Sequence, residues 1–288
     1  MITINQLTKH YGKARGVENI TLQIPKGTIY GFIGPNGAGK STTIKCMMNL
    51  LNQYEGEIYI DEQLVSNKNY RAKQEIGYLP SEIHLYDNLT VKKMLDYSAS
   101  FYAKDCSKRT QELVQKLEVD ETKKIEELSL GNLKKVGIII ALMHEPKVVI
   151  MDEATSGLDP LMQEKFYEIL TEEKEKGTTI FFSSHVLSEV KKICDQVAII
   201  KEGKIIKIEE MNHFSTSEMV QVTIKTNQIE EIITNLPIKT IQRRQEDEIQ
   251  FLYEGKTNEL VQTLAKIDVK KLIIEELNLE EIFMHYYQ

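Results

Sequence analysis

The stretch GPNGAGKST, residues 34–42, decides the fold of the N-terminal part of this chain. It follows GTIYGFIG, an almost continuously apolar run that is typical of a buried strand, and it precedes a predicted helix over residues 41–51. Residues 34–41 match the pattern G-x-x-x-x-G-K-[ST] in the strand–loop–helix setting that the pattern requires. Glycines let several backbone N–H groups point at one anion, and the N-terminal end of the following helix adds to that attraction. The stretch therefore predicts a phosphate-binding loop.

The side chains of this loop indicate which phosphates would be bound. Lys40 would reach the β- and γ-phosphates of a nucleotide, Ser41 would give its hydroxyl to Mg²⁺, and Thr42 could bond the α-phosphate. The predicted nucleotide-binding residues here are Gly34, Pro35, Asn36, Gly37, Ala38, Gly39, Lys40, Ser41 and Thr42. The alternative is an ordinary glycine-rich turn before a helix, which would not need every position of the motif.

A loop of this kind needs an acidic partner to complete a metal site, and VVIMDE at residues 148–153 supplies one. Four apolar residues predict a buried strand, and Asp152 at its end would hold Mg²⁺ through water. Glu153 follows beside the γ-phosphate, a position that suits a group polarising the attacking water. The alternative is a solvated pair of acids at a strand end.

Composition limits the other classes of function. The chain has 288 residues, is 41% hydrophobic and 27% charged, and has a net charge of −7 with no basic block, so no nucleic-acid partner is expected. Its three cysteines are far apart, which favours small buried side chains over a disulfide or a zinc site. The longest apolar run, residues 136–143, is far short of the roughly 20 residues that span a bilayer. Any membrane role is therefore expected to come through a partner.

The pattern along the chain predicts alternating strands and helices. ITINQLTK, VENITLQI and EGEIYIDEQ read as strands, and residues 80–146 read as mostly helical. Within that section Thr90 is a candidate N-cap, and Val91, Met94, Leu95, Phe101 and Tyr102 are expected on one helix face. KVVIMDE and TTIFFSSH return to buried strands, each followed by a helix, which favours a parallel sheet. A hairpin is expected around Gly203.

The pattern restarts at about residue 215. Strands and helices then follow in the order β-α-β-β-α-β, which predicts a small split βαβ domain. A final helix, NLEEIFMHYY, would begin with a capping box formed by Asn278 and Glu281.

Five motifs together resemble those of the ATP-binding-cassette (ABC) ATPases: GPNGAGKST, LSLGN, VVIMDE, SGLDP and SSH, in this order. The match covers roughly residues 1–210. It implies an α/β P-loop NTPase, with a RecA-like core, an antiparallel β subdomain and an inserted helical subdomain at about 80–146. The expected domains are thus a nucleotide-binding domain, 1–212, and a small C-terminal α+β accessory domain, 213–288. In the family two cassettes pair head to tail, so each ATP lies between the phosphate loop of one and the LSLGN-like signature of the other.

The resemblance assigns roles to residues outside the phosphate loop. Tyr11 matches the aromatic residue that stacks on adenine, and His185 matches the histidine that contacts the γ-phosphate. Asp159 lies in SGLDP, which matches the family's loop that passes between the two ATP sites. Ser129 and Gly131 would present a hydroxyl and a backbone N–H to the γ-phosphate of the partner cassette. The alternatives are a surface tyrosine, a structural histidine and a serine-capped helix without any contact across the dimer.

This sequence departs from the family pattern at three places. Ser81 stands where the family usually has glutamine; it could still bond a metal-bound water, although it is shorter. Ala154 replaces a usual proline. In LSLGN, Leu130 fills a position where a side chain can point away, and Asn132 keeps the amide of the usual glutamine.

A single cassette followed by a small C-terminal domain is similar to the ATPase subunits of bacterial ABC-2-type exporters. This implies ATP and Mg²⁺ as cofactors, a separate transmembrane permease, a second ATPase subunit that is identical or different, and a place on the cytoplasmic side of the membrane. The alternatives are a soluble ABC ATPase acting on nucleic acid or ribosomes, and a regulatory cassette with little turnover. Glu153 and His185 argue against the regulatory cassette.

Overall fold

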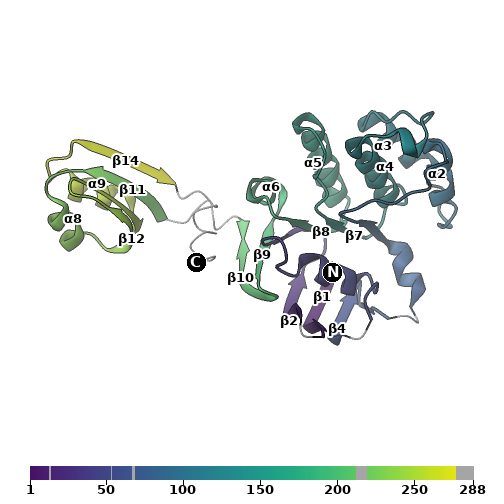
Figure 1. Cartoon of the computed structure of the whole chain (residues 1–288), viewed down its shortest axis with the longest axis horizontal. Helices are drawn as coiled ribbons and strands as arrows, with labels where there is room; N and C mark the ends of the chain where they lie inside the picture. Colours follow the sequence, from purple (N-terminus) through teal and green to yellow (C-terminus); the bar gives the residue numbers. More distant parts are fainter. Residues whose placement is uncertain (13, 53, 67–68, 212–218, 277–288) are drawn as a thin grey trace. The chain divides into compact units, whose positions relative to one another are not determined.

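The computed structural model of the chain describes residues 1–12, 14–52, 54–66, 69–211 and 219–276. The chain divides into two compact units, Met1–Met211 and Asn212–Gln288 (Figure 1).

A six-stranded sheet forms the centre of the first unit. Its strands, in spatial order, are β10 (Lys204–Glu210), β9 (Gln196–Lys201), β3 (Ile29–Ile33), β8 (Thr179–Ser184), β7 (Val148–Asp152) and β6 (Ile76–Leu79). The five strands from β9 to β6 are parallel, and β10 joins as an antiparallel edge through the hairpin at Gly203. Every residue of β3, β7 and β8 is buried, as expected for a parallel sheet covered on both faces. The predicted parallel sheet is confirmed.

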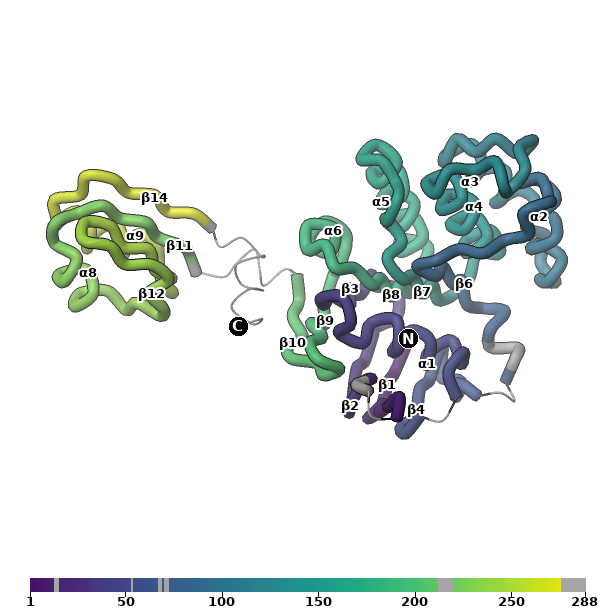
Figure 2. Tube along the Cα trace, viewed as in Figure 1, coloured from purple at the N-terminus to yellow at the C-terminus, as the bar shows by residue number. Residues whose placement is uncertain are grey.

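A second, antiparallel sheet has the order β2 (Ala14–Ile24), β1 (Ile2–Tyr11), β4 (Glu55–Ile60) and β5 (Gln63–Leu64). Its apolar side chains share one core with α1 (Lys40–Met47) and the central sheet, where the tilted rings of Phe32 and Phe181 pack with 5.2 Å between their centroids. Helices α5 (Pro160–Glu175) and α6 (Leu187–Ile193) lie on the opposite side of the central sheet (Figure 2).

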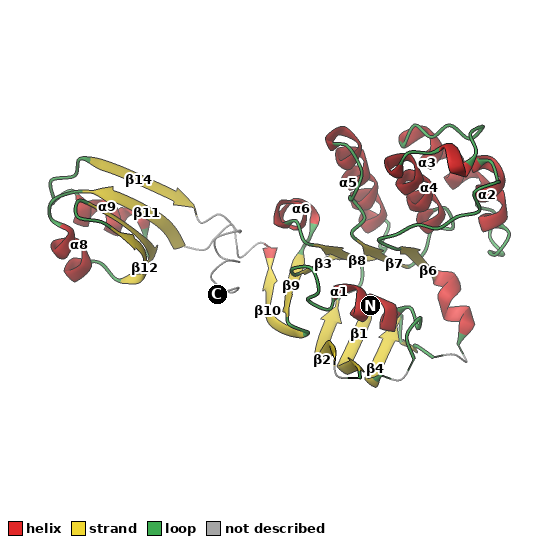
Figure 3. Cartoon of the chain, viewed as in Figure 1, coloured by secondary structure: helices red, strands yellow, loops and turns green. Residues whose placement is uncertain are grey.

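Three helices lie between β6 and β7 in the sequence: α2 (Val91–Ala99), α3 (Ser107–Lys116) and α4 (Leu130–Leu142). They gather beyond one end of the central sheet (Figure 3). The hydroxyl of Thr90 accepts a bond from the Lys93 N–H at 3.3 Å, so the predicted cap is confirmed. The predicted place of Phe101 is wrong: α2 ends at Ala99, which breaks the helical spacing, and Phe101 is 60% exposed.

His144 lies two residues after α4, buried and stacked on Tyr102 with 3.9 Å between the ring centroids. Burial lowers the pKa of His144 from 6.5 to about 4. The unfolded chain therefore takes up this proton first as the pH falls. We expect neutral His144 to contribute fully to the free energy of unfolding above about pH 6.5. This contribution, about 3 kcal/mol in all, should be lost progressively as the pH falls toward and below 4. Urea titrations across this pH range should show the free energy of unfolding falling with pH in the wild type and falling less steeply in His144→Gln. An equal dependence on pH in both proteins would contradict the role of His144.

The second unit contains β11 (Met219–Lys225), α8 (Ile229–Asn235), β12 (Ile238–Arg244), β13 (Glu248–Glu254), α9 (Thr257–Leu264) and β14 (Lys271–Glu276). The strands form one antiparallel sheet in the order β12-β13-β11-β14. Val222, Phe251 and Leu260 belong to a core that is separate from that of the first unit. The predicted final helix, with Asn278 and Glu281, lies outside the described residues.

Candidate active site

The phosphate loop connects β3 to α1 and is shaped by its glycines. Gly37 and Gly39 have positive φ angles of 78° and 111°, which L-residues with side chains rarely adopt. A Cβ on Gly39 would also lie 2.6 Å from Cγ1 of Val17. The loop therefore turns sharply against β2 and leads directly into the N-terminal end of α1, an arrangement suited to binding an anion.

Lys40 is a buried cation folded over this loop. Its Nζ donates to the carbonyl oxygens of Gly34 at 2.8 Å and Pro35 at 3.2 Å, and it lies 3.6 Å from Oε1 of Glu153. Burial lowers the pKa of Lys40, and the charges of Glu153 and Asp152 oppose that effect. The Lys40 amine is thus held close to two carboxylates, the partly exposed Glu153 and the buried Asp152, and an incoming phosphate would add further negative charge beside it.

Asp152 ends β7 and offers a buried carboxylate. Its Oδ1 accepts a hydrogen bond of 2.7 Å from the Ser183 hydroxyl on β8. Ser41 lines the adjoining cavity with its hydroxyl on the first turn of α1. Both are oxygen donors, the chemistry that Mg²⁺ prefers, and this ion usually takes one or two carboxylates and keeps several waters and phosphates as its other ligands. The residues therefore fit the metal that a nucleotide would bring.

Glu153 lies at the centre of the site. It has a positive φ of 49°, a strained conformation for a residue with a side chain, and its N–H donates to the Ser183 carbonyl at 3.1 Å. The turn directs its carboxylate between two cationic or proton-bearing groups: Oε1 lies 3.3 Å from Nδ1 of His185 and 3.6 Å from Nζ of Lys40. The strained backbone holds a partly exposed carboxylate in the lining of a cavity, where it is well placed to accept a proton from water.

His185 follows β8 and is half exposed. The preceding residue anchors it: the Ser184 hydroxyl donates to the buried carboxylate of Glu189 on α6 at 2.6 Å and also accepts from the Val186 N–H. The anchored backbone supports the position of the imidazole next to Glu153.

An open cavity of about 290 Å³ lies between the phosphate loop and Glu153. Its lining consists of Gly16, Asn36, Gly37, Gly39, Lys40, Ser41, Thr42 and Glu153. The structure therefore brings six of the nine predicted phosphate-loop residues together with Glu153, although they are more than 100 residues apart in the sequence. Gly34, Pro35 and Ala38 lie outside this lining, as do Asp152 and His185.

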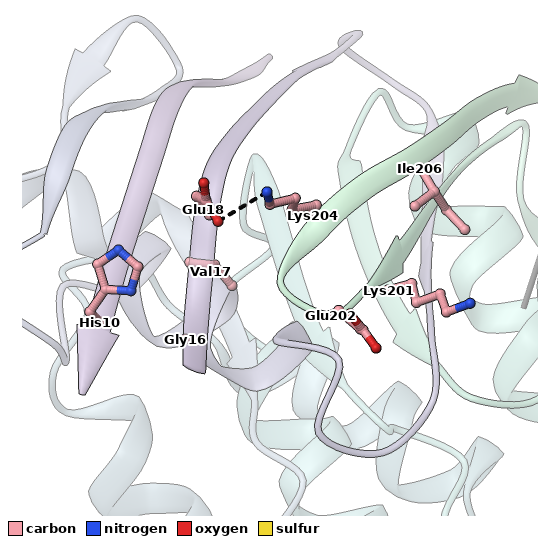
Figure 4. Close-up of a pocket in the computed structure, with 8 residues that line it drawn as sticks. All are labelled: His10, Gly16, Val17, Glu18, Lys201, Glu202, Lys204 and Ile206. Carbon is pink, nitrogen blue, oxygen red and sulfur yellow. Dashed lines mark ion pairs between the residues drawn. The ribbon is translucent and has the colours of Figure 1, made fainter. Parts of the chain in front are cut away.

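A second cavity of about 360 Å³ adjoins the first through Gly16 (Figure 4). It is lined by His10, Gly16, Val17, Glu18, Lys201, Glu202, Lys204 and Ile206, with an ion pair of 3.1 Å between Glu18 and Lys204. No pattern in the sequence predicts this second lining, because only the fold assembles it. In the folded chain β2 places Gly16 and Val17 opposite the phosphate loop, and the hairpin glycine Gly203 donates its N–H to the Ala38 carbonyl.

Comparison with known proteins shows the family. A protein-family model described as ABC transporter matches residues 17–156. The bacitracin transport ATP-binding protein BcrA of Bacillus licheniformis is 32% identical over 99% of this chain and 96% of its own length. The chain belongs to the ABC transporter ATPase family.

Other comparisons agree with this assignment. The lantibiotic transport ATP-binding protein SrtF of Streptococcus pyogenes is 37% identical over 73% of this chain and 91% of its own. A solved ATP-binding subunit of an ABC transporter superposes with a TM-score of 0.70 at 28% identity, covering 75% of this chain and 92% of that one. The predicted fold class and the predicted ATPase activity of an ABC cassette are confirmed.

The signature motif of this cassette lies at the start of α4. Ser129 caps the helix, accepting a bond from the Asn132 N–H at 3.4 Å, and its exposed hydroxyl keeps its own proton for another acceptor. Leu130 is 64% exposed, as its expected outward direction requires. A Cβ on Gly131 would lie 2.6 Å from the carbonyl oxygen of Gly157. This glycine is therefore needed for packing against the SGLDP loop, in addition to its predicted role toward phosphate.

Several residues with predicted roles do not line either cavity in this chain. Ser129 and Gly131 are outside both linings, as is Asp159, whose carboxylate caps α5 by accepting from the Met162 N–H at 3.0 Å. Tyr11 ends β1, is 43% exposed, and has Nζ of Lys9 at 5.8 Å from its ring centroid.

Ser81 has an exposed side chain on the loop after β6. Its carbonyl oxygen accepts a 3.0 Å bond from Nζ of Lys134, which also reaches the carbonyl oxygen of Glu153 at 3.4 Å. The structure therefore connects the Ser81 loop to the site through its backbone.

Within the part of the chain that the structure describes, no helix combines the length and the apolar character needed to cross a bilayer. All three cysteines are buried with free thiols.

Proposed function

We propose that this chain is the ATP-hydrolysing subunit of a bacterial ABC exporter and that it drives transport through a separate transmembrane permease. The observation that carries the exporter assignment is the similarity to a bacitracin transport ATP-binding protein along 99% of the chain, including the second unit. The placement of Glu153 beside the phosphate loop supports turnover rather than ATP binding alone.

Binding begins with the phosphates of ATP. The N–H groups of residues 34–42 and the N-terminal end of α1 would hold the β- and γ-phosphates, and Lys40 would exchange its carbonyl partners for phosphate oxygens. Mg²⁺, held through Ser41 and the Asp152 carboxylate, would neutralise charge on the phosphates. The adenine base and the ribose of ATP are expected near Tyr11 and the cavity lined by Val17, where both side chains offer apolar contact.

Hydrolysis would then proceed by attack of water on the γ-phosphorus. The Glu153 carboxylate accepts a proton from the attacking water, the bond from phosphorus to the bridging oxygen breaks, and ADP and inorganic phosphate result. His185 would bond the γ-phosphate and keep the carboxylate oriented through its 3.3 Å contact.

A second cassette would complete the site. Ser129 has an exposed hydroxyl at the N-terminal end of α4, and it lies outside the cavity of its own chain. A head-to-tail pair would bring that hydroxyl and the N–H of Gly131 to the γ-phosphate on the partner, with Asp159 passing between the sites. A solved bacterial ABC transporter cassette described as dimeric is 25% identical and has a TM-score of 0.67.

The permease would contact the cassette next to the loop of residues 81–89. An exposed aromatic ladder lies there: Tyr86 and Tyr97 are 5.6 Å apart between ring centroids, and Tyr97 and Phe101 are 5.0 Å apart. Exposed apolar clusters of this kind are typical of interaction sites, and an apolar cytoplasmic segment of a permease is the expected occupant. This contact would place the chain at the cytoplasmic face of the membrane.

We expect the tagged full chain to co-purify in mild detergent with a polytopic membrane protein. Replacing Phe101 by serine should reduce the recovered permease several-fold, whereas Ile208→Ser, at another exposed apolar residue, should not. Truncation after Glu210 tests the second unit, which we propose aids dimerisation or regulation. Recovery of ribosomes or nucleic acid in place of a membrane protein would contradict the exporter assignment.

A further inference from the structure

We propose that Lys134 is a positioning residue for hydrolysis, which ties the signature helix and the Ser81 loop to the backbone of Glu153. This inference rests on the proposed function and deepens it. It starts from an unusual observation: Lys134 is a lysine on α4 that is only 1% exposed. Lysine is almost never fully buried unless its ammonium group is paired.

The partners of this ammonium group are backbone carbonyls. Nζ donates to the carbonyl oxygens of Ser81 at 3.0 Å, Pro80 at 3.4 Å and Glu153 at 3.4 Å. The first two belong to the loop that leaves β6 and the third to the turn that leaves β7. Because β6 and β7 are adjacent parallel strands, their carboxyl ends meet at one edge of the sheet, and Lys134 lies across that junction from α4.

Burial lowers the pKa of Lys134, and the charges of Asp152 and Glu153 oppose that effect. The ammonium thus lies within the electrostatic field of both acidic residues of the site. A buried cation held by carbonyls beside two carboxylates fixes geometry more than it adds stability, because its desolvation is costly.

The Glu153 turn needs such support. Its φ of 49° is a strained conformation, and only the surrounding structure can hold it. The N–H of Glu153 is fixed by the Ser183 carbonyl, and its carbonyl oxygen is fixed by Lys134. Both peptide groups flanking the Glu153 side chain are therefore constrained, which sets where the carboxylate points.

The other end of this connection reaches the signature. Lys134 lies five residues after Ser129, and one turn later Gly137 lies so close to the loop that a Cβ there would meet Cδ1 of Ile83 at 2.5 Å. The loop of residues 80–83 is thus attached to α4 by a polar contact and an apolar one. A shift of α4 when Ser129 contacts a partner cassette, or of the loop when a permease binds, would therefore move Lys134 and, through it, the backbone of Glu153. The exposed side chain of Ser81 does not need to make that link.

The test compares Lys134→Met, which keeps length but removes the donor, with Lys134→Gln, which keeps a neutral donor. Lys108→Met, at an exposed lysine on α3, is the matched control. For the full chain we expect Lys134→Met to lower kcat for ATP by about 10- to 100-fold with KM within about two-fold, since small misplacements of a catalytic group have effects of this size. Lys134→Gln should lie between Lys134→Met and the wild type.

A second readout does not depend on activity. Hydrogen exchange of the peptides over residues 76–89 should slow when ATP binds to the wild type and to Lys108→Met. In Lys134→Met this slowing should be lost while ATP still protects the phosphate loop. If Lys134→Met does not fold, the same measurements on Lys134→Gln decide the question, with a partial loss expected in both.

Three results would overturn the inference: a folded Lys134→Met with wild-type kcat, a Lys134→Met that loses ATP binding with its activity, or Lys134→Gln as slow as Lys134→Met. Failure of the proposed function is distinguishable, because it would appear in the wild type, as an absence of ATP hydrolysis or as recovery of ribosomes or nucleic acid in place of a membrane protein. Hydrolysis that stops in Glu153→Gln but continues in Lys134→Met would reject only the inference about Lys134.

Discussion

Replacing Lys40 by alanine is expected to weaken the binding of ATP by at least about 100-fold. The Lys40 amine is already preorganised above the loop by the Gly34 and Pro35 carbonyls, and phosphates would replace these neutral partners with charged ones. Two charge-assisted hydrogen bonds of about 1.5–3 kcal/mol each exceed the roughly 2.8 kcal/mol that a 100-fold change in Kd represents. Titration calorimetry with MgATP measures the difference directly.

The control for this substitution is Lys45→Ala, which changes an exposed lysine in the last turn of the same helix. It should bind ATP as the wild type does. The fold of Lys40→Ala is expected to persist, since the variant no longer has to bury an ammonium group. An affinity for ATP equal to that of the wild type would show that Lys40 does not bind the phosphates.

Replacing Glu153 by glutamine is expected to lower kcat by at least about 100-fold while ATP still binds, because loss of a general base typically costs about 10²–10⁴-fold. Glutamine has the same shape and can keep the contacts to Lys40 and His185, but it cannot take the proton from water. The positive φ strains glutamine and glutamate alike, so the backbone turn should remain. Phosphate release, followed in steady state, gives the rate.

Glu175→Gln, at an exposed position at the end of α5, is the matched control and should hydrolyse ATP at the wild-type rate. Turnover by Glu153→Gln close to that rate would remove Glu153 from the mechanism. It would leave the binding role of Lys40 intact, because the two residues make separate contributions to the cavity.

Much of the fold follows from local patterns. The runs GTIYGFIG, KVVIMDE and TTIFFSSH each contain consecutive apolar residues because β3, β7 and β8 are covered on both faces, and this indicates a parallel sheet without knowledge of its strand order. The phosphate loop is predictable because one chain segment supplies every group, from the turn glycines to Lys40. Phe101 shows the limit: helical spacing was extended past Ala99, where the helix ends.

The rest of the site depends on contacts between distant segments. Gly131 looked like a residue chosen for phosphate, and its close approach to Gly157 appears only when α4 and the SGLDP loop are folded together. Lys134 has no predicted role in the sequence. A signal for it existed, since Lys134 shares the face of Gly137, Ile138 and Ala141 at spacings of three, four and seven. Which carbonyls it would reach could not be read from that spacing.

We expect ATP to be hydrolysed at a site shared by two cassettes. The most direct measurement is sedimentation of the Glu153→Gln chain, alone and with any second cassette that co-purifies, with and without MgATP. We predict an assembly with two cassettes, twice the 33.2 kDa of this chain if both are copies of it, that forms only with MgATP and is lost when Ser129 is replaced by arginine. Cassettes that bind ATP and sediment singly under both conditions would contradict the claim.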